Sequence, residues 1–168
     1  MRDYELVTDT DGPALLSVFG GKITTYRILA ETVMERLRSP LKINAPAWTE
    51  TACLPGGDIA DADFDGFLGR CRQQYPWLDT SVLQDYTRNY GTEIDLVLAS
   101  CTDMDSLGRH FGGGLYECEL CYLIEHEWAE TADDVLWRRS KKGLRLSPAE
   151  ADRVGRWIED YRSDMATR

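Results

Sequence analysis

Only two stretches of this 168-residue chain have the residue pattern of β-strands, and both lie within its first 20 residues. Residues 4–8 alternate polar and apolar side chains, as a half-buried strand does, and residues 15–19 form a short, mostly apolar strand after a turn at 9–13. Two strands alone do not make a stable sheet. We therefore expect this segment to be the end of a domain whose beginning is absent.

A glycine pair at residues 20–21 ends the second strand, and a helix is expected to follow it. Thr24 or Thr25 can cap that helix, which should run to about Leu37 with an apolar side. Residues 39–59 then contain three prolines and a second glycine pair, which is typical of a linker.

The rest of the chain is predicted to be helical. The last helix has the clearest start, because Ser147 at the N-cap, Pro148 at the first position and Glu150 three residues after the cap form a complete capping box. Gly143 is expected to be the C-cap of the helix before it. The other helices are predicted at about 63–74, 80–90, 93–100, 116–129 and 132–142, with a loop over 102–115. The fold class is therefore mainly α, preceded by a β-turn-β-α segment.

Composition indicates a globular protein, because 43% of the residues are hydrophobic and 29% are charged. No apolar run approaches the length of a spanning helix, and the first 20 residues do not resemble a secretory signal. A net charge of −10 disfavours nucleic acid as a partner. Basic residues are concentrated after residue 135. This stretch is expected either to lie against the acidic middle of the chain or to form a docking surface for a partner or an anionic membrane.

The chain has five cysteines, an odd number, so we expect reduced thiols in the cytoplasm. Cys118 and Cys121 form a C-x-x-C pattern, but no second such pair is present to complete a zinc site. They are predicted to be two helical thiols in or near the core, and no metal is expected.

Three other patterns are better explained by structure than by chemistry. Residues 61–66 match the opening of a calcium loop, but Arg72 stands where the twelfth-position glutamate should be, so a helix start is favoured. The glycines at 112–114 lack the context of a phosphate loop and are predicted to form a hinge or tight turn between helices. His126, between two glutamates, is interpreted as a structural or surface histidine.

The strongest candidate site is the segment after the second strand, residues 18–27. Glycine in this place lets another group approach the backbone closely, and a helix start offers free N–H groups with a positive dipole end. Lys22 adds a full positive charge at the same place. The segment therefore suits an anion, a phosphate or an electron-rich ring oxygen, although a plain turn with a surface lysine would have the same sequence.

Residues 17–27 resemble the Ser-Val-Phe-Gly-Gly-Lys-Leu/Ile-Thr-Thr-Tyr-Arg signature of the flavin-dependent, quinone-linked glycerol-3-phosphate dehydrogenases. Further segments are similar to motifs of that family and occur in the same order. They are Arg-Asp-Tyr at 2–4, Leu-Pro-Gly-Gly at 54–57, Glu-His-Glu-Trp-Ala at 125–129 and the stretch from Asp133 to Arg139.

The resemblance implies an FAD enzyme that oxidises sn-glycerol 3-phosphate to dihydroxyacetone phosphate and passes the electrons to a membrane quinone. The chain resembles the C-terminal third of such an enzyme, which would be peripheral on the cytoplasmic face of the inner membrane. Residues 1–44 would be the remnant of the FAD-binding and substrate domain, and residues 45–168 a helical C-terminal cap domain. The isolated chain is then expected to bind no FAD and to be inactive, and its first partner would be the rest of the same polypeptide.

The resemblance also assigns roles to residues. Gly20, Gly21, Lys22, Ile23 and Thr24 match the segment of the family that lies beside the flavin ring. For the substrate, Lys22 matches a lysine that lies close to both flavin and substrate, and Arg2 matches an arginine that is expected to bind the substrate phosphate. No general base is expected in this chain, so it holds no catalytic residue.

In the helical part, the family motifs are interpreted as packing. Trp128, Trp137 and Trp157 are expected in the core, and Arg138 and Arg139 near the C-terminal end of a helix. Two alternatives remain at this stage: a helical protein-interaction or membrane-docking module without catalysis, and a flavin oxidase relative with another substrate. A homo-oligomer also remains open.

Overall fold

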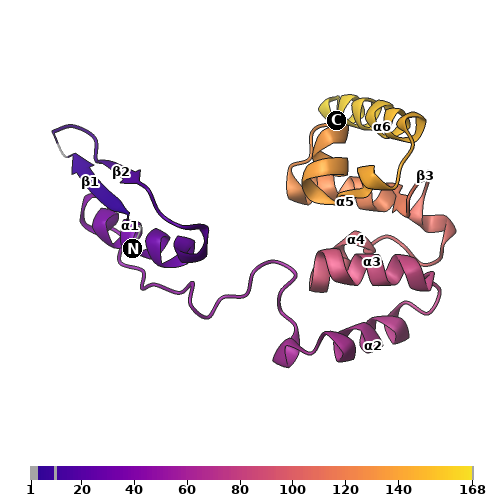
Figure 1. Cartoon of the computed structure of the whole chain (residues 1–168), viewed down its shortest axis with the longest axis horizontal. Coiled ribbons are helices and arrows are strands. Elements are labelled where there is room, and N and C mark those ends of the chain that lie inside the picture. The colour runs from indigo at the N-terminus through magenta and orange to yellow at the C-terminus, as the bar shows by residue number, and fades with distance from the viewer. Residues whose placement is uncertain (1–3, 10, 168) are drawn as a thin grey trace. The chain divides into compact units, whose positions relative to one another are not determined.

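The computed structural model describes residues 4–9 and 11–167, and it divides into two compact units. The N-terminal unit is Met1–Cys53 and the C-terminal unit is Leu54–Arg168 (Figure 1). Helices dominate, and two small two-stranded sheets are described. The predicted fold class, mainly α with a β-turn-β-α segment at the start, is confirmed. The division at 53/54 lies nine residues beyond the predicted boundary at 44/45, which stays a prediction for the whole protein.

The N-terminal unit is a β-hairpin beside one helix. Strand β1 (Glu5–Asp9) pairs antiparallel with β2 (Leu15–Phe19), and Leu6 lies opposite Val18. A 3-10 turn, η1 (Ile23–Thr25), leads into α1 (Tyr26–Leu41) (Figure 1). The two strands and the helix therefore lie where the sequence pattern predicted them.

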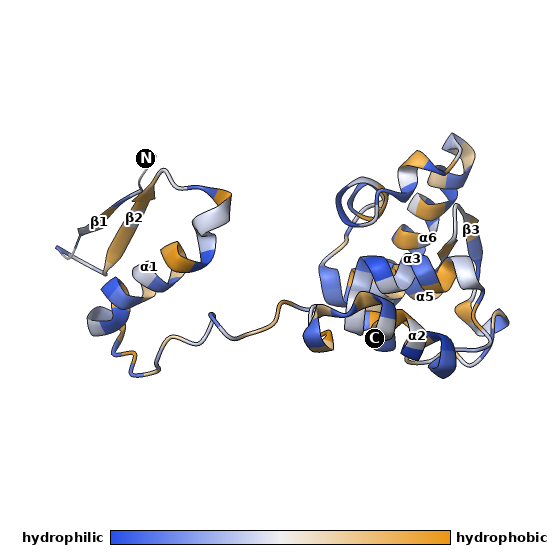
Figure 2. Cartoon of the chain, turned by 60° about the horizontal axis from the view of Figure 1, so that its bottom comes forward, coloured by the Kyte–Doolittle hydropathy of each residue, from blue (hydrophilic) through white to orange (hydrophobic). Residues whose placement is uncertain are grey.

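The hairpin and the helix are joined mainly by polar contacts, and few apolar side chains are buried between them. Arg36 Nη1 donates to the carbonyl oxygen of Leu6 at 3.2 Å, and the hydroxyls of Tyr4 and Thr32 are 3.3 Å apart. Leu6 is the one buried residue among the described residues of this unit. Figure 2 shows β2 coloured as hydrophobic, and Phe19 remains 58% exposed.

The linker predicted over 39–59 is more ordered than expected. Helix α1 continues to Leu41 with Pro40 in its last turn, and Lys42 closes it in the left-handed conformation at φ 53°. Pro40 has no N–H to donate to the carbonyl oxygen of Arg36, so the last turn lacks one helical hydrogen bond and the helix ends one residue later. Thr49 hydrogen-bonds Glu31 of α1, so part of the linker packs on that helix.

Helices α2 (Phe64–Gln74) and α3 (Thr80–Tyr90) begin the C-terminal unit and pack against each other. Asp63 and Asp79 cap them by accepting hydrogen bonds from Gly66 N and Ser81 N, so the acidic run at 61–66 is a helix start, as predicted. Among the described residues, no cluster of three or more potential metal ligands is found. The remaining elements of this part are η2 (Ala60–Ala62), η3 (Gly91–Glu93), α4 (Ile94–Val97) and η4 (Asp105–Leu107).

A small β-hairpin occupies the end of the region predicted to be a loop. Strand β3 (His110–Gly112) pairs antiparallel with β4 (Leu115–Tyr116). The first of the three glycines ends β3, and the other two form the turn between the strands. All three have positive φ, which explains why glycine stands there. The prediction of a turn was right, but the turn joins two strands and not two helices. The strands were missed because segments of two or three residues are too short to show an alternating pattern.

After α5 (Glu117–Glu127), the structure departs from the helix predicted over 132–142. A π-helix, η5 (Asp134–Arg139), is followed by a 3-10 turn, η6 (Lys142–Leu144). Gly143 lies inside that turn, so its predicted role as a C-cap was wrong. A β-carbon at this position would stand 2.6 Å from ring atoms of Trp137, which explains the glycine. The final helix, α6 (Pro148–Ala166), has the complete capping box predicted at Ser147.

One core unites the C-terminal unit, with 23 buried apolar side chains drawn from α2 through α6. Trp157 belongs to it, as predicted, but Trp128 is 82% exposed and Trp137 is 43% exposed. Trp128 is the left-handed cap residue of α5, so its side chain leaves the face that the helical spacing assigned to it. Trp137 lies on the π-helix, where the period of 3.6 residues no longer applies.

Among the described residues, no helix combines the length and apolar character needed to cross a bilayer. Cys118 and Cys121 are partly buried on α5 and pack against the core, which confirms the prediction of two helical thiols. Burial raises the pKa of the Cys118 thiol to about 12, so it is a poor nucleophile.

Candidate functional site

The glycine pair after β2 has backbone geometry that other residues rarely adopt. Gly20 has φ 82° and Gly21 has φ 108°. A β-carbon at Gly21 would also lie 3.3 Å from Leu29 Cδ2, so the position is both strained and tight for a side chain. The pair therefore turns the chain from β2 towards α1 and leaves a bare backbone that a flat ligand can approach.

Lys22 stands directly before the helical turn, in an extended conformation. Its carbonyl oxygen accepts hydrogen bonds from the backbone N–H of Thr25 at 3.0 Å and from the Thr25 hydroxyl at 3.1 Å. The Thr25 hydroxyl therefore donates to the turn and makes no N-cap bond, contrary to the expectation from sequence. The positive helix end lacks a side-chain cap and can face an anion beside the Lys22 ammonium group.

The segment from Gly20 to Thr24 is exposed throughout, and Ile23 is 88% exposed. An exposed isoleucine beside an uncapped helix start gives the segment an apolar contact as well as a cationic one. That combination suits a ligand with a flat ring and an electron-rich edge. The assignment of these five residues to a cofactor stays a prediction, and Arg2 lies outside the described residues.

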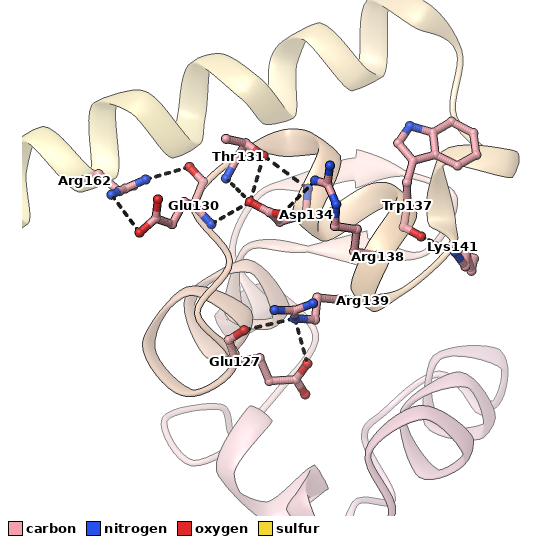
Figure 3. A network of polar contacts seen from close by, with 9 residues as sticks. All are labelled: Glu127, Glu130, Thr131, Asp134, Trp137, Arg138, Arg139, Lys141 and Arg162. Carbon is pink, nitrogen blue, oxygen red and sulfur yellow. Dashed lines mark hydrogen bonds and ion pairs between the residues drawn. The ribbon is translucent and has the colours of Figure 1, made fainter. Parts of the chain in front are cut away.

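The motif residues of the C-terminal unit form a polar network around the π-helix (Figure 3). Asp134 accepts hydrogen bonds from the backbone N–H groups of Glu130 and Thr131 and from the Thr131 hydroxyl, and Arg138 pairs with it at 2.8 Å. These hydrogen bonds lower the pKa of the Asp134 carboxyl to about 2, Thr131 having the largest effect. Thr131 and Asp134 thus accept hydrogen bonds from each other's backbone N–H groups, as the two ends of a capping box do, and fix the turn that leads into η5.

Two arginines attach this network to the neighbouring helices. Arg139, in the last turn of η5 as predicted, donates to the carbonyl oxygen of Glu127 at 3.0 Å (Figure 3). Arg162 of α6 donates to the carbonyl oxygen of Glu130 at 2.9 Å. The motif that resembles the family's helical domain therefore supports packing between η5 and its neighbouring helices.

A buried ionic cluster lies at the centre of the C-terminal unit, and sequence reasoning missed it. Lys142 Nζ lies 2.6 Å from Glu119 Oε2 and 2.8 Å from the carbonyl oxygen of Gly114, while the Tyr90 hydroxyl donates to Glu119 Oε1 at 2.6 Å. Lys142 is 2% exposed and Glu119 is fully buried. Burial raises the pKa of Glu119, and the adjacent Lys142 opposes that shift. The residues are 23 positions apart, so no local pattern could have indicated the pair.

His126 is exposed and its ring stacks on Tyr122, with ring centres 5.3 Å apart. It therefore fits the surface or structural histidine predicted from the sequence.

Comparison with known proteins gives a family match over most of the chain. A model for the C-terminal domain of alpha-glycerophosphate oxidase matches residues 47–161. The aerobic glycerol-3-phosphate dehydrogenase of Escherichia coli is 46% identical over 162 residues, and the D-erythritol 1-phosphate dehydrogenase of Brucella abortus is 44% identical over 160 residues. A glycerol-3-phosphate dehydrogenase of Pseudomonas aeruginosa is 43% identical over 160 residues.

These alignments cover 94% to 95% of this chain but 31% to 32% of each relative. The chain therefore spans about a third of the length of the relatives it matches.

Proposed function

Because the chain belongs to the family of the C-terminal domain of alpha-glycerophosphate oxidase, we propose that it is the C-terminal part of an FAD-dependent dehydrogenase that oxidises sn-glycerol 3-phosphate to dihydroxyacetone phosphate. The observation that carries the proposal is the 46% identity to the Escherichia coli dehydrogenase across 95% of the chain. That alignment covers both units, so it supports one role for the whole chain.

Within this proposal, the segment Gly20–Thr24 would lie beside the flavin. The flavin, when bound, would accept the hydride that leaves the substrate carbon. The bare backbone at Gly21 and the uncapped start of η1 fit a flat ring with an electron-rich edge. The Lys22 ammonium group and the helix dipole stabilise negative charge that develops there, as an oxyanion hole does. Lys22 also attracts the substrate phosphate, together with Arg2.

The cap role of residues 45–168 and the transfer of electrons to a membrane quinone are further parts of the proposal. Attachment to the cytoplasmic face of the inner membrane belongs to the same hypothesis. Because the Gly20–Thr24 segment is exposed, we expect other parts of the whole protein to enclose its ligand.

A second substrate has specific support. The D-erythritol 1-phosphate dehydrogenase is within two percentage points of the Escherichia coli enzyme in identity to this chain. Both substrate names denote a polyol phosphate, and a cation such as Lys22 recognises the phosphate common to both. The two substrates differ in the carbon chain, so the discriminating contacts must involve other residues.

A hybrid enzyme tests the proposal directly. The chain replaces the segment that it matches in the Escherichia coli dehydrogenase, and oxidation of glycerol 3-phosphate and of D-erythritol 1-phosphate is measured with an artificial electron acceptor. We expect activity with glycerol 3-phosphate and a loss of about 10²- to 10³-fold in kcat for Lys22→Ala. Lys42→Ala, at an exposed cation of the same unit, should leave kcat unchanged.

A hybrid that folds and retains flavin but oxidises neither substrate would overturn the proposal. Activity with D-erythritol 1-phosphate alone would move the specificity to the second substrate. The isolated chain is expected to be inactive and free of FAD, and stoichiometric flavin on the purified chain would contradict this expectation.

A further inference from the structure

A hollow of about 250 Å³ lies between the C-terminal half of α3 and the segment that follows the π-helix. Four of the eight residues that line it are cationic and one is acidic. The chain as a whole carries a net charge of −10, so this hollow has the opposite sign to the protein around it. A local positive concavity in an acidic protein attracts anions that the rest of the surface repels.

Two of the four cations are already neutralised. Lys142 pairs with the buried Glu119, and Arg145 Nη1 lies 2.6 Å from Asp85 Oδ2. Arg88 and Lys141 are different, because no carboxylate among the described residues lies within ion-pair distance of either. The uncompensated charge of the hollow is therefore about +2. A phosphate monoester carries a charge of nearly −2 near neutral pH, so the two charges match in size and are opposite in sign.

The positions of these groups are restricted by contacts with the rest of the C-terminal unit, of which those of Lys142 are buried. Lys142 anchors the segment to the carbonyl oxygen of Gly114 and to Glu119, while the ion pair between Arg145 and Asp85 joins it to α3. Arg88 lies with its guanidinium 5.7 Å from the centre of the Phe64 ring, which limits its motion. Lys141 follows the π-helix in the left-handed conformation at φ 57°, and its ammonium group contacts the carbonyl oxygen of Trp137 (Figure 3).

We propose that this hollow binds a phosphate group, with Arg88 and Lys141 as its principal ligands. A guanidinium can engage two phosphate oxygens at once, and the lysine adds a point charge. The side-chain amide of Asn89 also lines the hollow and has no hydrogen-bond partner among the described residues, so its NH₂ group can donate to a third oxygen. The inference goes beyond the proposed oxidation and does not rest on it. The phosphate can belong to a soluble metabolite or to a lipid headgroup.

The test is a titration of the ¹⁵N-labelled 168-residue chain with sodium phosphate at constant ionic strength, followed by amide chemical shifts. We expect saturable shifts at residues 88–89 and 140–145. The Arg88→Ala/Lys141→Ala double variant should weaken binding by about tenfold. Both side chains are exposed, so the variant should keep the fold, which circular dichroism confirms independently.

Arg70→Ala is the matched control. Arg70 is also an exposed arginine over a phenylalanine ring, at 6.0 Å from the centre of Phe67, but it does not line the hollow. Its loss should leave the phosphate affinity within about twofold of the original. Equal weakening by Arg70→Ala, or non-saturable shifts scattered over the basic surface, would overturn the proposal.

Vesicles identify the source of the phosphate. Phosphatidylcholine vesicles with and without phosphatidic acid are sedimented with the chain and with the double variant. Sedimentation that requires phosphatidic acid and both cations assigns the site to a lipid headgroup. Saturable phosphate binding without sedimentation assigns it to a soluble phosphate ester, and the absence of both responses overturns the site.

Discussion

The two units of the chain differ most in how their apolar side chains are used. The N-terminal unit buries Leu6 alone among its described residues and leaves Phe19, Ile23 and Ile28 more than half exposed. The C-terminal unit gathers 23 buried apolar side chains into one core. The N-terminal unit is therefore held by hydrogen bonds between its hairpin and its helix, whereas the C-terminal unit is stabilised by its own core.

The largest expected effect is at the buried ionic cluster of the C-terminal unit. Lys142→Met leaves Glu119 buried without its cation, and we expect a loss of about 3–5 kcal/mol in the free energy of unfolding of this unit. Lys141→Met, at the exposed neighbour, should change it by less than about 0.5 kcal/mol. Urea unfolding followed by near-ultraviolet circular dichroism measures both. Equal effects of the two variants would show that the cluster does not support the core.

The next effect tests the contrast between the units themselves. Leu120→Ala removes a fully buried side chain and should cost the C-terminal unit about 3 kcal/mol, because it leaves a cavity. Leu15→Ala, at a residue that is 59% exposed in the N-terminal unit, should change no unfolding transition by more than about 0.5 kcal/mol. A cost at Leu15 comparable to that at Leu120 would mean that the hairpin has a core of its own.

A smaller effect concerns a glycine that the sequence suggested for the wrong reason. Gly143→Ala pushes a methyl group into the ring of Trp137 and should destabilise the C-terminal unit by about 1–2 kcal/mol. A red shift in tryptophan fluorescence should accompany the change as the ring becomes more exposed. Gly69→Ala is the control, since a methyl group added there in α2 would meet no other atom within 4 Å, and it should stabilise the helix by about 0.5–1 kcal/mol.

The smallest effect is the pH dependence of Asp134. Its pKa is lowered to about 2 in the folded chain, so its stabilising contribution is complete above the ordinary aspartate pKa and is lost as the pH falls towards 2. The stability difference between the original chain and Asp134→Asn should therefore be constant from about pH 5 to 7 and shrink below about pH 4. A difference that stayed constant down to about pH 2 would contradict the hydrogen-bond network.

Local signals in the sequence predicted the elements that depend on local contacts. The capping box at Ser147 was predicted in full, because all of its hydrogen bonds join residues within one helical turn. The glycine turn before α1 was predicted for the same reason, since positive φ depends on the residue itself. The uncapped start of α1 was not predicted, because the Thr25 hydroxyl donates to the carbonyl oxygen of Lys22 and does not cap the helix.

Features that depend on distant contacts or on irregular helices could not be predicted. Trp128 and Trp137 were assigned to the core by helical spacing, but a left-handed residue and a π-helix change the direction of their side chains. The ion pair between Glu119 and Lys142 is stabilising only when both side chains are enclosed, which no pattern of neighbours reveals. Of the candidate site, the glycine turn before Lys22 was predicted from its local pattern, whereas Arg2 lies outside the described residues.

The burial of Lys142 also constrains how the protein is made. Glu119 and Tyr90 leave the ribosome before Lys142 does, and without that cation the carboxylate would have to enter the core uncompensated. If helices α2 to α5 closed around Glu119 before residue 142 was synthesised, its carboxyl group would be buried without the Lys142 cation, so we expect the final packing to await Lys142. We therefore expect the C-terminal unit to complete its packing late in synthesis, when the segment that carries Lys142 is present.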